Sequence, residues 1–491
     1  MNKIIWGICA LNHDASIAVV CNNKILFAAH SERYSRIKND HLLHQGLIDA
    51  AWEFGIPDQI VWFERPIIKK VRQLYAEQWG EVLTQTPHAY LKSLGLGDVP
   101  IKYVSHHESH AAAGYFTSNF NDAAIIVVDA IGEWDTISVW SAKGKKLTKL
   151  HSCTYPDSLG LLYSAMTDRI GLKANEEEYI LMGMAAYGEP IYVDAIISDF
   201  IRSMDGPDFE LKQNVHRGIR GWRPNLVSED DYKNIAASIQ SIAETFMCNI
   251  VQWANDTIDS DNLILMGGVA LNCVANEKIA RLGIYDDLWL MPNPGDAGSA
   301  IGCVAAYLKE HLVWDGPYLG TNITNEFDVN EVVDAILEHK IIGIAHGRAE
   351  FGPRALGNRS LIADPRGSEI KSKVNDIKKR QQFRPFAPIV LEHLAHEYFD
   401  LPVRTSPYMQ FTAKCLYPDL YPAICHVDGS SRVQTLNREQ NPDMYAVLEE
   451  FYARTGCPIL LNTSLNIKGE PLVDSWDDAI RFSDHHRVPV Y

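Results

Sequence analysis

The stretch "SHHESHAAAGYFTS", residues 105–118, brings three histidines and one glutamate close together in the chain. A zinc-protease motif needs H-E-x-x-H, and here His110 follows Glu108 one residue too early. On a helix, His106 and His110 share one face, whereas His107 points about 100° away from it. Two imidazoles on one face can bind one divalent metal if carboxylates complete the ligand set. The alternative is a histidine cluster that binds nothing.

Two aspartates could complete such a site. Asp129 ends the apolar strand "AAIIVVD", and Asp296 lies in the loop "NPGDAGSA" before another expected helix. Two histidines and two aspartates with open coordination positions suit a divalent Fe, Mn or Mg ion better than a closed structural zinc site.

A second group of candidate residues is basic and lies within residues 354–384. It consists of Arg354, Arg359, Lys378, Arg380 and Arg384. Arginine forks match pairs of phosphate oxygens and lysine adds a point charge, so the group predicts a site for phosphorylated substrates. The later stretches "HVDGSSRVQT" (426–435) and "LLNTSLN" (460–466) add polar side chains that could hold a nucleotide.

The elements that must position these residues begin with a repeat. "IIWGICALNHDASIAVVCNNKILFAAHSER" is typical of strand, turn, strand, tight turn and strand. When Asp14 is aligned with Asp135, the turn "CNNK" coincides with "AKGK" in a later copy. We interpret this as a duplicated subdomain rather than a chance likeness of two meanders. Two such subdomains facing each other have the layout of the actin-like ATPases.

The rest of the chain predicts two α/β domains. Residues 232–258 have helical periodicity, and the strand "NLILMGG" then runs into Gly267, Gly268 and a further helix, which is a pattern that can cradle an anion. The Gly-, Pro- and Asn-rich residues 313–330 are expected to be a linker. The expected domains are therefore 1–312 and 331–491.

Composition limits the functional classes. The chain has 491 residues, a formal net charge of −17 and 46% hydrophobic residues, as in a globular enzyme whose overall field repels polyanions. Its nine cysteines form no CxxC pair, and no run of about 18 apolar residues is present. We therefore expect a cytoplasmic protein with reduced cysteines and no membrane association; oligomerisation stays open.

A series of ordered blocks resembles the NodU/CmcH family of O-carbamoyltransferases. They include "LNHDASIAV", "SHHESHAAAGYF", "MGGVALNCVANEKI", "NPGDAGSAIG", "GRAEFGPRALGNRSLIADPR", "KKRQQFRPFAP" and "LNTSLNIKGEP", and they extend over nearly the whole chain. The resemblance implies an α/β protein with a duplicated actin-like (ASKHA) ATPase domain followed by a smaller YrdC-like domain. One departure is Ile180, where the family usually has a lysine.

The resemblance also implies a chemistry in two stages. The second domain would form carbamoyl adenylate from ATP and carbamoyl phosphate, and the first would transfer the carbamoyl group to a hydroxyl. The implied carbamoyl phosphate ligands are Arg354, Arg359, Lys378 and Arg384. Those for the nucleotide are Arg380, Arg432, Ser464 and Asn466, with Gly267, Gly268 and Asn272 at the adenylate. The metal would be bound by His106, His110, Asp129 and Asp296. The implied catalytic residues are His13, as general base, with Lys378, Arg380 and Arg384.

The acceptor is the least determined partner. Relatives modify small natural products and sugars, and some modify hydroxymethylated cytosine in nucleotides or DNA. The segment "HRGIRGWRPN" (216–225) mixes three arginines with Trp222, as a nucleic-acid contact would, although a solvated surface loop has the same composition. An alternative of another class is an actin-like nucleotide-binding ATPase or scaffold without transfer activity.

Overall fold

The computed structural model describes residues 3–491, which form two compact units. The first unit comprises residues 3–31 and Asn39–Trp314, and the second comprises Glu32–Lys38 and Asp315–Tyr491. The boundary after Trp314 lies close to the expected one. The segment Glu32–Lys38 was expected in the first domain, and its place in the second unit is a correction to that prediction.

Two five-stranded sheets form the framework of the first unit, and they have the same topology. One has the order β3-β2-β1-β4-β5 and the other the order β8-β7-β6-β11-β12. In each, the first three strands of the chain form an antiparallel meander, and two further strands add in parallel beyond the first. The strands of the first sheet are β1 (Ile4–Cys9), β2 (Ser16–Cys21), β3 (Lys24–His30), β4 (Gln59–Trp62) and β5 (Ile101–Tyr103). Those of the second are β6 (Asp122–Gly132), β7 (Asp135–Lys143), β8 (Lys146–Thr154), β11 (Asn262–Met266) and β12 (Asp287–Trp289).

The sequence explains these hairpins locally. Asn22 and Asn23 link β2 to β3 with φ of 48° and 61°, the left-handed conformation that a two-residue hairpin turn requires and asparagine tolerates. Strands β1, β2 and β6 are almost continuously buried and rich in Val, Ile and Ala.

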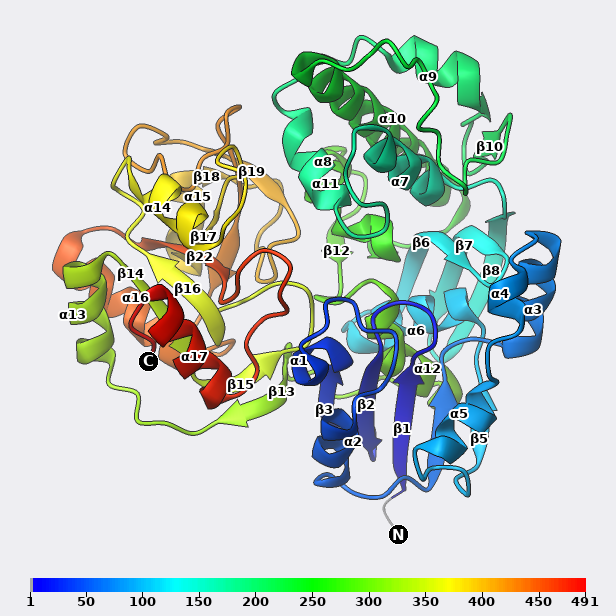
Figure 1. The fold of residues 1–491 in the computed structure, drawn as a ribbon, viewed down its shortest axis with the longest axis horizontal. Coiled ribbons are helices and arrows are strands. Elements are labelled where there is room, and N and C mark those ends of the chain that lie inside the picture. The colour runs from blue at the N-terminus through cyan, green and yellow to red at the C-terminus, as the bar shows by residue number, and fades with distance from the viewer. Residues whose placement is uncertain (1–2) are drawn as a thin grey trace. The chain divides into compact units, whose positions relative to one another are not determined.

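Two helices join the sheets. Helix α6 (His106–Thr117) packs against β6, α12 (Ser299–Leu308) packs against β1, and the two helices pack against each other between the sheets (Figure 1). Both are buried on nearly every side, which explains their high content of alanine, glycine and serine. The side chains that α6 presents at its start therefore lie in the interior of the first unit.

The other helices that begin before Trp314 are α1 (Ser31–Ser35), α2 (Gln45–Trp52), α3 (Pro66–Tyr75), α4 (Trp79–Val82), α5 (Pro87–Ser93), α7 (Leu159–Arg169), α8 (Glu178–Ala185), α9 (Val193–Phe200), α10 (Glu229–Thr257) and α11 (Cys273–Arg281). Of these, α1 belongs almost wholly to the second unit, and α8, α9 and α11 pack against α10. A capping box between Ser228 and Asp231 starts α10 three residues before the predicted helix. A short hairpin of β9 (Ile201–Ser203) and β10 (Glu210–Leu211) follows α9.

The second unit is built on a mixed sheet with the order β14-β16-β22-β17-β21. Its strands are β14 (Ile341–Ala345), β16 (Arg359–Ala363), β22 (Ile459–Ser464), β17 (Ala387–Leu391) and β21 (Gln434–Leu436). Its helices are α13 (Val329–His339), α14 (Ile370–Ile377), α15 (Ala395–Tyr398), α16 (Pro442–Thr455) and α17 (Trp476–His486). A separate three-stranded sheet has the order β18-β19-β20 and consists of β18 (Phe399–Asp400), β19 (Thr412–Cys415) and β20 (Ser430–Arg432).

The expected linker, residues 313–330, is largely part of this unit. It contains β13 (Tyr318–Ile323), which pairs with β15 (Gly347–Glu350), and the start of α13, whose N-terminus Asp328 caps. The linker prediction was therefore too long, because the Gly-Pro turn at its start obscured the strand that follows.

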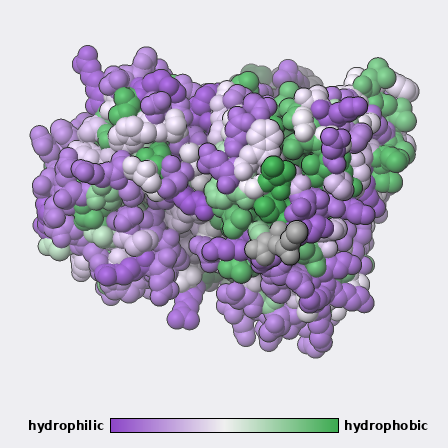
Figure 2. Space-filling view, turned by 90° about the horizontal axis from the view of Figure 1, so that it is seen from below, coloured by the Kyte–Doolittle hydropathy of each residue, from purple (hydrophilic) through white to green (hydrophobic). Residues whose placement is uncertain are grey.

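Within residues 3–491, none of the helices combines the length and hydropathy needed to cross a bilayer. The face shown in Figure 2 is predominantly hydrophilic, and its hydrophobic side chains lie in separate patches.

Candidate functional site

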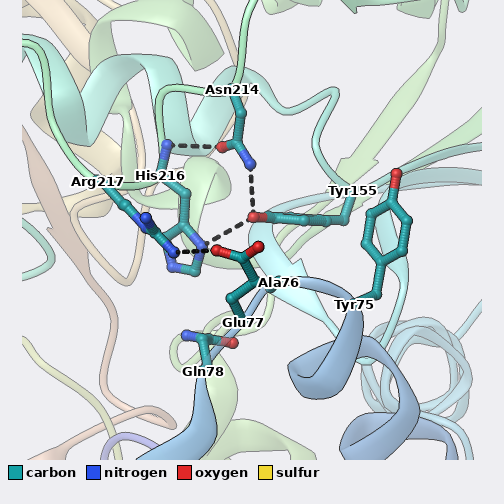
Figure 3. Close-up of a pocket in the computed structure, with 8 residues that line it drawn as sticks. All are labelled: Tyr75, Ala76, Glu77, Gln78, Tyr155, Asn214, His216 and Arg217. Carbon is teal, nitrogen blue, oxygen red and sulfur yellow. Dashed lines mark hydrogen bonds and ion pairs between the residues drawn. The ribbon is translucent and has the colours of Figure 1, made fainter.

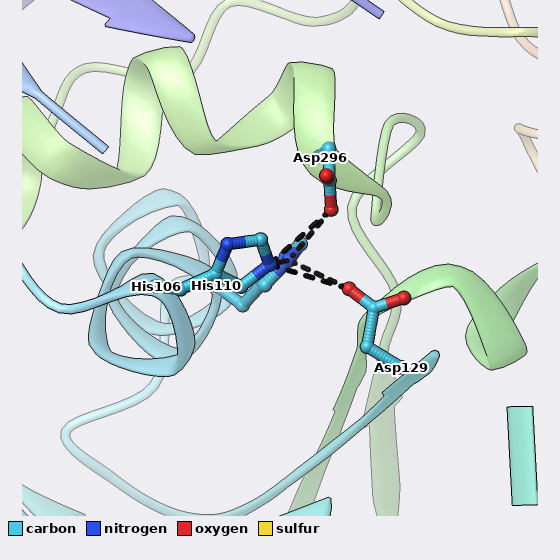
Figure 4. Close-up of side chains that lie close together, drawn as sticks. All are labelled: His106, His110, Asp129 and Asp296. Atoms are coloured by element: carbon cyan, nitrogen blue, oxygen red, sulfur yellow. Dashed lines mark hydrogen bonds and ion pairs between the residues drawn. The ribbon is translucent and has the colours of Figure 1, made fainter. Parts of the chain in front are cut away.

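Four side chains converge at the start of helix α6. His106 and His110 lie one helical turn apart, and their Nε2 atoms are 3.1 Å from each other. Asp129, near the end of β6, and Asp296, in the turn before α12, each place one carboxylate oxygen 3.3–3.4 Å from both Nε2 atoms (Figure 4). The structure thus brings together the four residues that the sequence singled out as metal ligands.

Charge explains how these groups can lie so close together. Burial lowers the pKa of His106, but Asp296 and Asp129 together raise it well above its usual value. Burial raises the pKa of Asp296, but the two histidines lower it to about 2. The cluster therefore needs positive charge between its carboxylates, which either protons or a metal cation can supply.

The donor set fits a divalent metal. Imidazole nitrogen and carboxylate oxygen are the ligands that Fe, Mn and Zn accept, and four donors from one side leave room for a substrate oxygen. All four ligand atoms lie within 4.8 Å of one another, with the histidines fully buried and the aspartates slightly exposed. His107 takes no part: its Nδ1 lies 2.7 Å from Ser138 Oγ, and burial lowers its pKa well below the usual value.

Two residues that support this cluster were missed in the sequence. Asn12 donates a hydrogen bond to Asp296 Oδ2 at 3.1 Å, and the carboxylate of Glu133 accepts one from the backbone N–H of His106 at 3.3 Å. Arg65 binds Glu133 through two of its nitrogens. Asn12 and Glu133 are 121 positions apart, which is the same separation as that of Asp14 and Asp135. Glu133 therefore occupies the position in the second copy of the repeat that Asn12 occupies in the first, so the repeat could have indicated Glu133.

The glycine turn adjoins the cluster. Gly267 has a φ of 87°, and a Cβ there would come within 2.2 Å of Val128 O; a Cβ on Gly268 would lie 3.1 Å from Asp129 Oδ1. Only glycines therefore allow the backbone to pass so close to β6. Asn272 is different: its side chain caps α11 and pairs with Gln240, so it supports the turn from within.

His13 lies in the first turn of the repeat. Its Nδ1 is 2.9 Å from Asp14 Oδ2, and its Nε2 is 3.1 Å from the carbonyl oxygen of Asn175. Burial lowers its pKa, but Asp14 and Asp296 raise it to about 9. A general base must be neutral, so this role for His13 stays a prediction that requires acceptor binding to change these contacts.

The second unit contains a buried lysine at the end of α14. Lys378 Nζ donates to the backbone oxygen and hydroxyl of Ser464, at 2.5 and 3.1 Å, and to the backbone and side-chain oxygens of Asn466, both at 2.9 Å. Ser464 Oγ donates in turn to Asn466 Oδ1 at 2.7 Å. Three of the residues expected to bind the substrates, Lys378, Ser464 and Asn466, are therefore in direct contact.

Two arginines influence the pKa of Lys378 through their charge. Burial, Arg380 and Arg384 together lower the pKa of Lys378 well below its usual value. Arg380 is held by Asn375 Oδ1 at 2.6 Å and lies 4.1 Å over the ring of Phe386. Since the neighbouring charges that shift Lys378 are positive, an anion bound here would relieve their repulsion.

The other expected phosphate ligands are arranged differently. Arg359 is fully buried, and its guanidinium donates to the carbonyl oxygens of five residues. They are Thr321, His346, Gly347, Asn358 and Asp474. Arg359 thus holds loops together, and its expected contact with carbamoyl phosphate stays a prediction. Arg354 is half-buried in the loop before β16, and Arg432 is half-buried at the end of β20.

A cavity of about 480 Å³ opens in the first unit, between the end of α3 and residues 214–217. Tyr75 and Tyr155 form an aromatic wall with their ring centroids 6.4 Å apart, while Asn214 and His216 lie within hydrogen-bonding distance of Tyr155 Oη (Figure 3). Arg217 pairs with Glu77 at 3.2 Å. The cavity therefore combines flat apolar faces with polar groups, as sites for small polar ring compounds do.

A chain of contacts through Arg72 connects this cavity to the histidine–aspartate cluster. The guanidinium of Arg72 lies 5.9 Å over the ring of Tyr155 and donates to Glu133 O at 3.0 Å. Glu133 is the residue whose carboxylate binds the backbone of His106.

The basic segment 216–225 is neutralised by acidic partners. Arg220 makes a two-pronged pair with Asp168, and both Arg223 and the indole N–H of Trp222 contact Asp199. With Arg217 also paired, the segment offers no row of unpaired arginines along a strand of nucleic acid.

Family models match both units. A model described as "Carbamoyltransferase N-terminus" matches residues 71–306, and one described as "Carbamoyltransferase C-terminus" matches residues 333–491. The chain therefore belongs to the carbamoyltransferase family and is an enzyme that transfers a carbamoyl group. This membership decides against the alternative of a scaffold without transfer activity.

Several known proteins are similar to this chain. Nodulation protein NolNO of Sinorhizobium fredii is 30% identical over 95% of this chain and 76% of its own length. Nodulation protein NolO of Bradyrhizobium diazoefficiens is 33% identical over 77% of this chain and 75% of its own. An uncharacterized protein of Synechocystis is 35% identical over 97% and 93%. Among solved structures, HypF of T. kodakarensis aligns with 64% of this chain and 48% of its own at 14% identity and a TM-score of 0.39.

Proposed function

We propose that the chain is an ATP-dependent O-carbamoyltransferase that makes carbamoyl adenylate in its second unit and uses it in its first. The repeated sheet order of the first unit supports an actin-like duplicated domain, and the resemblance in sequence supports a YrdC-like second domain. The observation that carries the proposal is the convergence of His106, His110, Asp129 and Asp296 in one unit, together with a buried lysine beside two half-buried arginines in the other.

In the second unit, water hydrolyses carbamoyl phosphate to carbamate and phosphate. A carbamate oxygen then attacks the α-phosphorus of ATP, the bond to the β-phosphate breaks, and pyrophosphate leaves. Lys378, Arg380 and Arg384 supply the positive charge that two anionic substrates need in order to approach each other. Ser464 and Asn466 hold the lysine in position.

In the first unit, the acceptor oxygen attacks the carbamoyl carbon, and the bond from that carbon to the adenylate oxygen breaks. AMP leaves, and the hydroxyl proton passes to a base, for which His13 is the candidate. A divalent ion held by the two histidines and two aspartates would act as a Lewis acid toward adenylate phosphate oxygens. Gly267 and Gly268 allow the backbone to lie close to such an adenylate.

The acceptor that best fits is a small ring-bearing alcohol, such as a sugar or nucleoside. Tyr75 and Tyr155 offer ring faces, and Asn214 and His216 offer hydrogen bonds, in the cavity whose wall leads to the histidine cluster. Duplex or single-stranded DNA is less favoured because the arginines of 216–225 are paired with carboxylates.

The direct test is incubation of the purified chain with ATP and carbamoyl phosphate. We expect pyrophosphate release that requires carbamoyl phosphate, followed by a carbamoyl adduct on one member of a panel of sugars, nucleosides and hydroxymethylcytosine DNA. Release of ADP without carbamoyl phosphate would contradict the proposed first step. An adduct on DNA alone would contradict the proposed acceptor class.

A further inference from the structure

A second group of metal-ligand side chains lies on the edge strand of the second sheet, apart from the histidine–aspartate cluster. His151 and Cys153 are two positions apart on β8, so their side chains share one face of the strand. Asp208 comes from the turn between β9 and β10. The three ligand atoms, one each of nitrogen, sulfur and oxygen, lie within 4.8 Å of one another.

The distances match tetrahedral coordination. His151 Nε2 is 3.5 Å from Cys153 Sγ and 3.5 Å from Asp208 Oδ1. Zinc bonds to these atom types at tetrahedral angles separate nitrogen from sulfur by about 3.6 Å and nitrogen from oxygen by about 3.4 Å. Both distances from His151 therefore match the spacing of ligands around a bound ion.

A catalytic relay of cysteine, histidine and aspartate is a poor account of the same residues. In such a relay the thiol and the carboxylate face opposite nitrogens of the imidazole. Here both face the same atom, Nε2 of His151, and one ring nitrogen cannot serve both in a proton relay.

Contacts with α10 support His151 and the turn that bears Asp208. Phe209, next to Asp208, is buried and packs edge-on against Phe246 of α10, with ring centroids 5.1 Å apart. Trp253 of α10 packs edge-on against His151 at 5.7 Å. The loop bearing Asp208 is also tied to α10 by a hydrogen bond from Asn249 to Met204 O.

We propose that His151, Cys153 and Asp208 form a second metal site that binds Zn²⁺, with water as the fourth ligand. One thiolate, one imidazole and one carboxylate are the donors that zinc accepts, and partial exposure of Asp208 leaves the fourth position open to solvent. The bound ion fastens the β9–β10 turn to the edge strand β8. Because Leu211 of this hairpin donates to Asp157 Oδ1 at 2.7 Å, the ion also steadies the chain next to Tyr155.

The test uses the full chain, Co²⁺ and Zn²⁺ as probes, and readouts that do not involve transfer activity. In the His106→Ala/His110→Ala background we expect one remaining equivalent of Co²⁺ with a thiolate-to-cobalt absorption band. Cys153→Ser should remove the band, and Asp208→Asn, which changes the most exposed ligand, should weaken Zn²⁺ binding about tenfold or more. The matched control is Cys248→Ser, which changes a partly buried thiol on α10. It should leave the cobalt absorption band and the Zn²⁺ affinity unchanged.

Absence of the thiolate band in this background would overturn the second site, and so would a band that persists in Cys153→Ser. Neither outcome depends on carbamoyl transfer, so the second metal site and the proposed function are tested independently. Circular dichroism of each variant distinguishes loss of a ligand from loss of the fold.

Discussion

The buried lysine of the second unit owes its properties to its neighbours. Lys378 is almost inaccessible, donates to four oxygens, and yet has a lowered pKa because it is buried next to Arg380 and Arg384. An anionic substrate would remove this conflict, so binding energy and proton uptake are coupled at this residue.

We predict that Lys378→Ala reduces carbamoyl phosphate-dependent pyrophosphate release by about 100-fold or more, because a preorganised positive charge is lost. Lys373→Ala, an exposed lysine on the same helix, is the control and should release pyrophosphate normally. In the wild type, KM for carbamoyl phosphate should rise as the pH rises through the lowered pKa of Lys378, since a neutral amine attracts anions less. Unchanged release in Lys378→Ala would remove this residue from the site.

Residue types and spacing were sufficient for some of these roles and not for others. His106 and His110 could be paired from helical periodicity, and Asp129 from its place at a strand end. Arg359 could not be understood in this way, because sequence does not distinguish an arginine that binds phosphate from one that is saturated by five backbone carbonyls.

At the scale of elements, the cavity depends on two segments that are far apart in the chain. Helix α3 ends with Tyr75, and residues 214–217 close the opposite side. The pairing of Arg217 with Glu77 joins these segments at the surface. Specificity for the acceptor can therefore change through either segment without altering the framework of the sheets.

We predict that Tyr75→Ala raises KM for the ring-bearing acceptor about fivefold and leaves pyrophosphate release unchanged, because it removes a stacking face worth about 1 kcal/mol. Tyr75 is 66% exposed, so the protein should fold normally. The control is Tyr103→Ala, at another partly exposed tyrosine of the same unit. Equal KM values for Tyr75→Ala and the wild type would place the acceptor elsewhere.

The duplicated element was the part of the fold most accessible from sequence. In each copy, apolar strands are separated by turns that contain asparagine or glycine. The structure contains both copies, and their sheets have the same strand order. The parallel strands β4, β5, β11 and β12 are paired over long sequence separations, which local periodicity does not reveal.

At the scale of the whole molecule, the proposed reaction assigns one chemical step to each unit. We predict that His106→Ala/His110→Ala lowers bound metal by one equivalent and transfer by about 100-fold or more, while pyrophosphate release persists. Metal analysis and a pyrophosphate assay on the same preparation check this. His88→Ala, an exposed histidine in the first unit, is the control. Equal loss of both steps would contradict the division of labour.

The second unit contains seven residues from the N-terminal part of the chain, and no sequence pattern indicated this. In segment Glu32–Lys38, Arg33 donates to Gly352 O at 3.0 Å, and Arg36 donates to the carbonyl oxygens of Leu472 and Pro471. Tyr34 Oη lies 2.7 Å from Thr321 Oγ1. These are long-range contacts made by ordinary polar residues, so only the folded chain reveals them.

The polypeptide consequently passes from one unit to the other three times, after Ser31, Lys38 and Trp314. A single cut at the last junction would not yield two complete halves, because the C-terminal fragment would lack the peptide that Gly352 and Leu472 bind. If separate genes encoded the two units, the seven residues Glu32–Lys38 would have to be encoded with the second unit. Fission of this enzyme into independent proteins is therefore hindered by the path of its backbone.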